Sequence, residues 1–256
     1  MLLLKLFLVP GLVALVTLAV RRWGPAAGGW LAGLPIVAGP VLLFYAVEQG
    51  EAFAARAAHA TLSGLIATVA FAVAYGHSSR RFRWYVCVAI GWGVFGAAVL
   101  ALYLLQPGLM TSLVGLVAAA FSGARTLQGP AAPLTASRPV PGDLIVRLIA
   151  TAALVLVLTT LADRLGSVWS GLLNAFPVLT TIVAAFSHAQ RGTEAAVAFL
   201  NGYLQAIVGF GLFCAVMAVS LESLGLGLGL ILALAVQFAW HSTLLARSSR
   251  SGVARI

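Results

Sequence analysis

Long apolar segments follow one another along almost the whole chain, separated by short loops that hold most of the arginines. A helix needs about 20 apolar residues to span the hydrocarbon core of a bilayer. The sequence contains nine such segments, at residues 2–20, 25–47, 53–75, 84–105, 109–124, 144–162, 168–189, 195–220 and 224–246. It therefore predicts an all-α, polytopic integral membrane protein with about nine transmembrane helices.

Composition supports this interpretation. The chain is 62% hydrophobic and 8% charged, whereas soluble domains carry about 25% charged residues. The basic residues lie in short loops rather than on one face of a soluble domain, so the lipid bilayer is the expected partner and nucleic acid is excluded. Cys87 and Cys214 fall inside apolar segments, and we expect them to pack rather than to form a disulfide or bind a metal.

One stretch of the chain occurs twice. Residues 24–50 align with residues 166–192 without a gap, at an offset of 142 positions. The matches include Gly24 with Gly166, Pro35 with Pro177, and Gly50 with Gly192. The predicted organisation is a first repeat of four spans (1–105), a fifth span with a cytoplasmic linker (106–143), a second repeat of four spans (144–246) and a basic cytoplasmic tail (247–256).

The first segment could also be a signal peptide. The repeat argues against that alternative, because Leu12, Val13 and Thr17 match residues deep inside the chain at the same offset, namely Leu154, Val155 and Thr159.

The distribution of arginine predicts the topology. If residues 109–124 cross the membrane, twelve of the 15 Lys and Arg residues fall on one side; if they do not, the split is seven against eight. The excess of Lys and Arg in cytoplasmic loops therefore favours nine spans, with the N-terminus outside and the C-terminus in the cytoplasm of a bacterial inner membrane. The two copies would then form an inverted-topology repeat, as in many secondary transporters.

The two matched prolines are the first candidate site. Proline removes a hydrogen bond within a helix, which would loosen the carbonyls of Leu31 and Leu173 near mid-membrane. Paired interruptions of this kind are typical of transporter binding sites, although a packing kink is the alternative. The candidate substrate-binding residues here are Pro35 and Gly39 in the first copy and Pro177 in the second. Asn174, Thr180 and Thr181 are available partners for the carbonyl loosened in the second copy.

Polar residues on the third and eighth spans are the second candidate site. Arg56, His59 and Ser63 share one helix face, because they are spaced three and four residues apart. The second copy has Asn201 and Gln205 on the corresponding face, with Glu194 one turn earlier. Such residues usually face protein or a water-filled cavity. They could line a substrate site or form hydrogen bonds between helices, and His59 could titrate near neutral pH.

The sequence offers little for an enzyme. All six acidic residues fall at the predicted ends of spans, which weakens coupling to sodium or protons through carboxylates. Residues 91–96 match G-x-G-x-x-G but lie inside an apolar segment with no preceding soluble strand, so no dinucleotide site is expected. No catalytic set, metal-ligand motif or cofactor motif is apparent.

The stretch Gly171-Leu-Leu-Asn-Ala-Phe-Pro177-Val-Leu-Thr-Thr181, continuing to Arg191-Gly192, resembles the core of the small four-helix GlpM-like bacterial membrane proteins. The first copy departs from this motif, with Leu34-Pro35 in place of Phe-Pro. The resemblance implies an integral membrane fold, built here as a tandem duplication, and it supplies no substrate.

The sequence supports two hypotheses of function. The first is a small transporter or flippase-like permease with a midplane site between the second, third, seventh and eighth spans. If the prolines begin new half-helices, their N-terminal ends favour an anionic or carbonyl-bearing solute. The alternative is a non-transporting assembly or scaffold protein of the envelope. A homodimer is compatible with the sequence, but no residue pattern argues for one.

Overall fold

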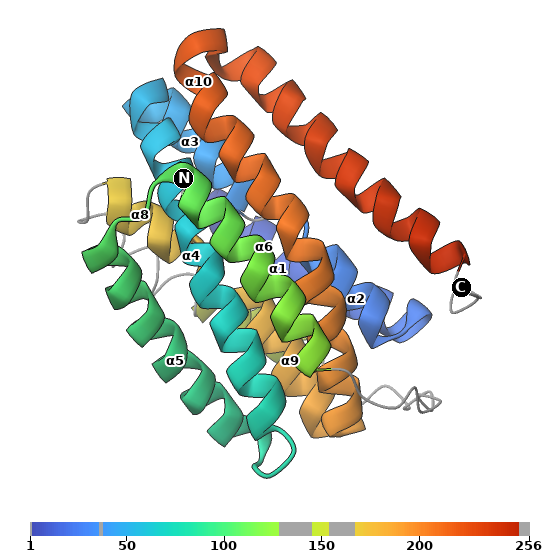
Figure 1. Cartoon of the computed structure of the whole chain (residues 1–256). Helices are drawn as coiled ribbons and strands as arrows, with labels where there is room; N and C mark the ends of the chain where they lie inside the picture. The colour runs from blue at the N-terminus through green and yellow to red at the C-terminus, as the bar shows by residue number, and fades with distance from the viewer. Residues whose placement is uncertain (1, 36–37, 128–144, 154–166, 251–256) are drawn as a thin grey trace.

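The computed structural model describes residues 2–35, 38–127, 145–153 and 167–250, and these ranges contain helices joined by turns, bends and short irregular segments. Residues 145–153 are helical. The helices with defined bounds, labelled in Figure 1, are α1 (Leu2–Trp23), α2 (Pro25–Ala32), α3 (Ala38–Gln49), α4 (Glu51–Ser78), α5 (Trp84–Leu105), α6 (Leu109–Thr126), α8 (Ser167–Asn174), α9 (Val178–Arg191) and α10 (Thr193–Arg250).

Five stretches of the described chain are helical, long enough and apolar enough to cross a membrane. They are Glu51–Ser78, Trp84–Leu105, Leu109–Thr126, Val168–Arg191 and Thr193–Ala246. The predicted all-α architecture is thus confirmed for the described residues, and the five candidate spans agree with the predicted multi-pass membrane protein. The segment predicted at 109–124 is among the five. The predicted linker, the basic tail and most of the segment at 144–162 lie outside the described residues.

Helix α10 consists of two arms. Gly225 has φ 74° and ψ 170°, a conformation that is not helical and is essentially restricted to glycine. The chain turns there, and Figure 1 shows the second arm, in red, running back along the first, in orange. We refer to residues 193–224 as the first arm and to residues 226–250 as the second arm. The two segments predicted at 195–220 and 224–246 correspond to these arms.

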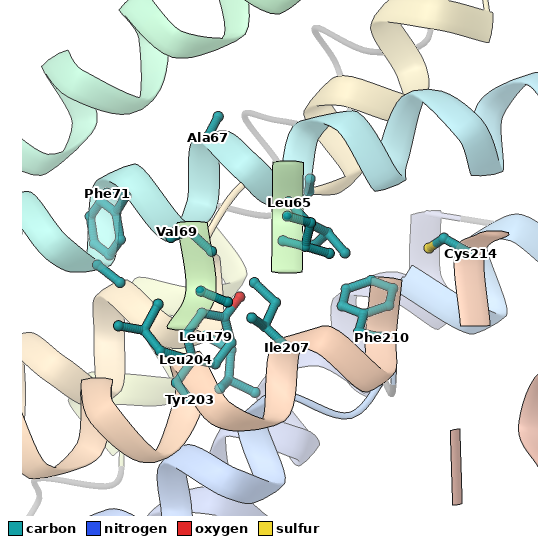
Figure 2. Packing of buried hydrophobic residues seen from close by; sticks show 14 of the residues in the cluster. Leu65, Ala67, Val69, Phe71, Leu179, Tyr203, Leu204, Ile207, Phe210 and Cys214 are labelled. Carbon is teal, nitrogen blue, oxygen red and sulfur yellow. The ribbon is translucent and has the colours of Figure 1, made fainter. Parts of the chain in front are cut away.

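The centre of the protein is the contact between α4 and the first arm of α10. Figure 2 shows Leu65 and Val69 of α4 beside Leu204 and Ile207 of the first arm, and each of these side chains is at most 2% exposed. Helix α5, in contrast, exposes a row of large apolar side chains that includes Leu100, Leu104 and Leu105. Because lipid is as apolar as these side chains, their exposure is expected of a span on the rim of the bundle.

Two predicted spans are each divided into two helices. The segment at 25–47 contains α2 and α3, and the segment at 168–189 contains α8 and α9. Pro35 and Pro177 lie in the interruptions, and α9 begins directly after Pro177. This position suits proline, which cannot donate the hydrogen bond that the interior of a helix requires. The prediction that both prolines interrupt their spans is confirmed.

Candidate functional site at the two helix breaks

The break between α8 and α9 is a compact turn. Pro177 has φ −78° and ψ 55°, close to an inverse γ-turn, and the Val178 amide donates to the Phe176 carbonyl at 2.8 Å. The Phe176 amide donates to the Leu173 carbonyl at 2.9 Å, and the Thr181 amide donates to the Pro177 carbonyl at 2.8 Å. Backbone groups therefore satisfy the polar atoms that the proline releases.

The break between α2 and α3 has the same hydrogen-bond pattern. The Leu34 amide donates to the Leu31 carbonyl at 3.1 Å, and the Gly39 amide donates to the Pro35 carbonyl at 2.7 Å. Each bond lies 142 positions before its counterpart at the other break. Sequence reasoning named Asn174, Thr180 and Thr181 as available partners for the Leu173 carbonyl. In the structure this carbonyl accepts from the backbone amide of Phe176 in the local turn.

Helix α4 contributes hydroxyl groups to the break between α8 and α9. We call this the second break, and the break between α2 and α3 the first break. The Thr68 hydroxyl donates to the Ala175 carbonyl at 2.6 Å, and the Thr61 hydroxyl contacts the Gly171 carbonyl at 3.1 Å. The Asn174 side-chain amide donates to the Thr61 hydroxyl at 3.4 Å. Asn174 is thus a link between α8 and α4.

The two threonines that follow Pro177 are buried and already have partners. The indole N–H of Trp92, on α5, donates to the Thr181 hydroxyl at 3.2 Å. Thr180 interacts with the side chain of Tyr203 on the first arm. Both threonines are 3% exposed. A solute that approached them would have to replace these contacts.

Close backbone contacts pack the short helices α2 and α8 against the long ones. A Cβ atom on Gly29 would collide with the Phe199 carbonyl oxygen, and one on Gly171 would collide with the Ala57 carbonyl oxygen. Only glycine permits such an approach. Gly29 and Gly171 are 142 positions apart, and so are Ala57 and Phe199. In each contact, a glycine of one copy therefore meets the long helix of the other copy.

A second pair of contacts lies at the breaks themselves. Here too, the partners in one contact lie 142 positions from the partners in the other, and each contact joins the two copies. A Cβ atom on Gly33 would collide with Ala206, and one on Gly64 would lie 2.7 Å from the Cβ atom of Ala175. Gly64 is in the middle of α4, which has 28 residues. A helix rises about 1.5 Å per residue, which puts this contact roughly 20 Å from either end of α4. Both breaks thus contact the middle of a long helix.

The predicted site residues His59 and Ser63 of α4 contact α6 and the loop before it rather than the breaks. His59 Nε2 lies 3.1 Å from the Pro107 carbonyl in the loop before α6, and the hydroxyls of Ser63 and Ser112 are 2.8 Å apart. Arg56, on the same predicted stripe, is exposed.

The polar residues of α10 also contact α6. The Asn201 amide donates to the Ala124 carbonyl at 2.7 Å, and the Gln205 amide donates to Asn201 at 2.6 Å. Glu194 is exposed at the start of the first arm. Most of the predicted site residues therefore form two groups, one at the helix breaks and one around α6, whereas Arg56 and Glu194 belong to neither.

Sequence reasoning missed a buried polar pair on the second arm. Gln237 is 1% exposed and His241 is 3% exposed. They are four residues apart, so they share a helix face. Their occurrence at i and i+4 inside an apolar segment was the available signal. Among the described residues there is no group of three or more side chains suited to hold a metal ion.

No protein-family model, no curated protein and no solved structure matches this chain.

Proposed function

We propose that this chain is a small transporter of the bacterial inner membrane, built from two inverted repeats, with a solute site at the level of the two helix breaks. The observation that carries the proposal is the exchange of contacts between positions 142 apart. Gly29 contacts Phe199 while Gly171 contacts Ala57. A contact that is repeated with its two partners exchanged is the mark of a two-fold axis.

The direction of the long helices supports inversion. Glu51, at the start of α4, accepts a hydrogen bond of 2.9 Å from the Leu226 amide, just beyond the far end of the first arm. Thr193, at the start of that arm, donates to the Ser79 carbonyl at the other end of α4, at 2.7 Å. The two equivalent helices thus run antiparallel. A two-fold axis that relates antiparallel spans lies in the plane of the membrane, as in transporters with inverted repeats.

The charges agree with the topology expected from the arginine count. Arg80, Arg81 and Arg83 directly follow Ser79, at the end of the bundle where Thr193 lies. Arg191 donates to the Val20 carbonyl at 3.4 Å, which brings the end of α1 to the same end. Glu51 lies at the opposite end. Cytoplasmic loops are rich in arginine, so this proposal assigns the N-terminus to the outside and the C-terminus to the cytoplasm.

The solute site in this proposal is formed by Pro35, Gly39, Pro177, Thr180 and Thr181. Helix α9 begins in the middle of the bundle, and the positive end of its dipole favours an anionic or carbonyl-bearing solute. Because both threonines now bond Trp92 and Tyr203, the compact arrangement is interpreted as a closed state. The Phe-Pro motif that resembles the GlpM-like proteins lies at this break.

One observation favours the alternative, a scaffold protein of the envelope without transport. The polar residues His59, Ser63 and Asn201 bond groups of α6 and of the loop before it. Polar residues used in this way stabilise a bundle and need no solute. A scaffold would keep its phenotype when Thr180 and Thr181 are replaced by valine.

The first test concerns inversion. Ala52 and Glu194 are exposed, lie one residue into α4 and α10, and are 142 positions apart. Single-cysteine variants Ala52→Cys and Glu194→Cys, made in a chain with Cys87→Ala and Cys214→Ala, are labelled in intact cells with an impermeant maleimide. The proposal expects labelling at Ala52→Cys and protection at Glu194→Cys until the cells are opened. Equal labelling of both would overturn the inverted repeat.

The second test concerns the solute. A panel of anionic and carbonyl-bearing solutes is screened for an increase in the melting temperature of the purified protein, because a ligand that binds only the folded state stabilises it. Each hit is then measured for uptake into proteoliposomes. Thr181→Val should abolish the stabilisation and the uptake, whereas the matched control Thr111→Val, at an exposed position of α6, should leave both unchanged. Equal loss in both variants would contradict a site at Thr181.

A further inference from the structure

The second arm of α10 carries two buried polar side chains that take no part in the proposed solute site. Gln237 Nε2 lies 2.9 Å from His241 Nδ1, and this Nδ1 atom also lies 3.1 Å from the Gln237 backbone carbonyl. The imidazole stands edge-on to the indole of Trp30 on α2, with the ring centroids 4.7 Å apart.

A glycine on the first arm makes room for this pair. A Cβ atom on Gly209 would lie 3.0 Å from Gln237 Nε2 and 3.1 Å from His241 Cε1. The Trp240 indole N–H, next to His241 in the chain, donates to the Gln205 carbonyl of the first arm at 3.2 Å. The pair is therefore enclosed by α2 and both arms of α10, close to the C-terminal end of α2 where the first helix break begins.

Each side chain of the pair has one buried polar atom without a hydrogen bond. These atoms are Gln237 Oε1 and His241 Nε2, although the Trp30 backbone is close enough to interact with the imidazole. If Nδ1 accepts from the Gln237 amide, then Nε2 carries the proton. If Nδ1 instead donates to the Gln237 carbonyl, then Nε2 is a free acceptor. Because an unpaired buried polar group costs stability, the pair requires a reason beyond packing.

The chain itself contains an apolar version of the same packing. The positions 142 residues before Gln237 and His241 are Phe95 and Val99 on α5, which are 4% and 5% exposed. The Phe95 ring packs against Phe176, next to the second break, with centroids 5.1 Å apart. An apolar pair is thus sufficient to hold an outer helix against the bundle, and the polar pair has a different role.

We propose that His241 is a proton-binding site that couples the transport to the proton gradient; the coupling rests on the proposed function, whereas the proton binding does not. Imidazole is the side chain that titrates in the neutral pH range. A proton taken from water on one side adds to the free ring nitrogen, and the same proton leaves to water on the other side, so no other bond forms or breaks.

The surroundings can accommodate the imidazolium. Once the ring is protonated, Nδ1–H donates to the Gln237 backbone carbonyl, and the Gln237 side-chain amide turns so that its Oε1 accepts in place of Nε2 beside Nδ1. The second N–H points to the enclosing backbone, and the Trp30 ring lies within the ~6 Å range of cation–π contacts. Gln237 acts as a positioning residue, because it holds the ring through Nδ1. Helix α2 contributes no ionisable side chain, the first arm near Gly209 contributes Tyr203 and the buried thiol of Cys214, and α6 contributes only the exposed Arg125 at its end.

The direct test is histidine NMR of the full chain in lipid nanodiscs. The chain has four histidines, so the His241 signal can be assigned from its loss in His241→Gln. We expect this signal to shift with pH between about pH 5 and about pH 8, and Gln237→Leu to move its midpoint. A His241 signal that does not change over this range would overturn the proton-binding site. A midpoint unchanged by Gln237→Leu would overturn the role of Gln237.

The coupling is tested in proteoliposomes with an imposed pH gradient. The variant Gln237→Phe/His241→Val copies the packing of α5 and should fold; it should lose uptake driven by the gradient while keeping exchange of solute across the membrane. If gradient-driven uptake persists in this variant, the proposal that His241 couples transport to the proton gradient is wrong, whereas the proposed transport function is retained. If His241 titrates but no solute of the panel moves, the proton site stands, while the coupling and the proposed function both fail.

Discussion

The hydroxyl of Thr68 on α4 donates a hydrogen bond of 2.6 Å to the carbonyl of Ala175, at the break between α8 and α9. The position 142 residues later is Phe210, which is buried and has no polar group to offer. The two breaks thus have matching backbone hydrogen bonds but differ in the chemistry around them. The second break is tied to a long helix by hydroxyl groups, and the polar pair of Gln237 and His241 lies near the first.

Replacing Thr68 by valine should loosen the second break. The change keeps the shape of the side chain and leaves the buried Ala175 carbonyl without this partner. Hydrogen bonds between membrane helices contribute about 0.6 kcal/mol on average and up to about 1.7 kcal/mol. We expect a loss in this range, measured by reversible unfolding of the purified protein. Thr111→Val, at an exposed position, is the control and should change stability by less than the test variant.

Glu51 caps the second arm of α10. Its carboxylate accepts from the Leu226 amide at 2.9 Å, at a helix start where negative charge is favourable. Glu51→Ala should cost about 1 kcal/mol, the typical value for a lost N-cap. Glu48→Ala, at a neighbouring exposed position, is the matched control. An equal effect of both substitutions on the melting temperature would show that Glu51 acts only through general charge.

The glycines at the backbone contacts should not tolerate a methyl group. Gly29→Ala and Gly171→Ala each introduce a Cβ atom that collides with a carbonyl oxygen on a long helix, and overpacking typically costs about 1–3 kcal/mol. Gly93→Ala on α5 meets no atom within 4 Å and should be neutral or stabilising, because alanine favours a helix over glycine. Stability measured in one detergent compares the three variants. Similar effects of Gly29→Ala and Gly93→Ala would contradict the close approach of α2 to α10.

Much of the fold could be predicted from the sequence because it depends on local properties. Apolar segments of sufficient length mark the spans, and a proline in mid-segment marks a break. Gly50 and Gly192 align at the offset of the repeat, and each has a positive φ, 88° and 84°, directly before a long helix. Such positions can be predicted from the sequence, because only glycine adopts that conformation readily.

The roles of the polar residues could not be predicted, because helical spacing gives the face of a helix and not the neighbour that covers it. The face with His59 and Ser63 is covered by α6, a helix outside the repeat. Asn174 bonds Thr61 instead of a loosened carbonyl. His241 was missed because its partner Trp30 lies far away in the sequence, and its environment exists only once α2 and α10 have packed.

The contact of Ser63 with Ser112 separates the two interpretations of the polar residues on α4. Their hydroxyls are 2.8 Å apart, and Ser112 is fully buried. If the pair only fastens α6, a double-mutant cycle with Ser63→Ala and Ser112→Ala should give a coupling energy of about 0.6 kcal/mol in unfolding. Solute binding, once a ligand is found, should then be the same in all four proteins of the cycle. A cycle with no coupling in stability, combined with weaker solute binding in both single variants, would return Ser63 to the solute site and show that α6 lines it. The stability of each variant is therefore measured with and without the solute in the same preparation.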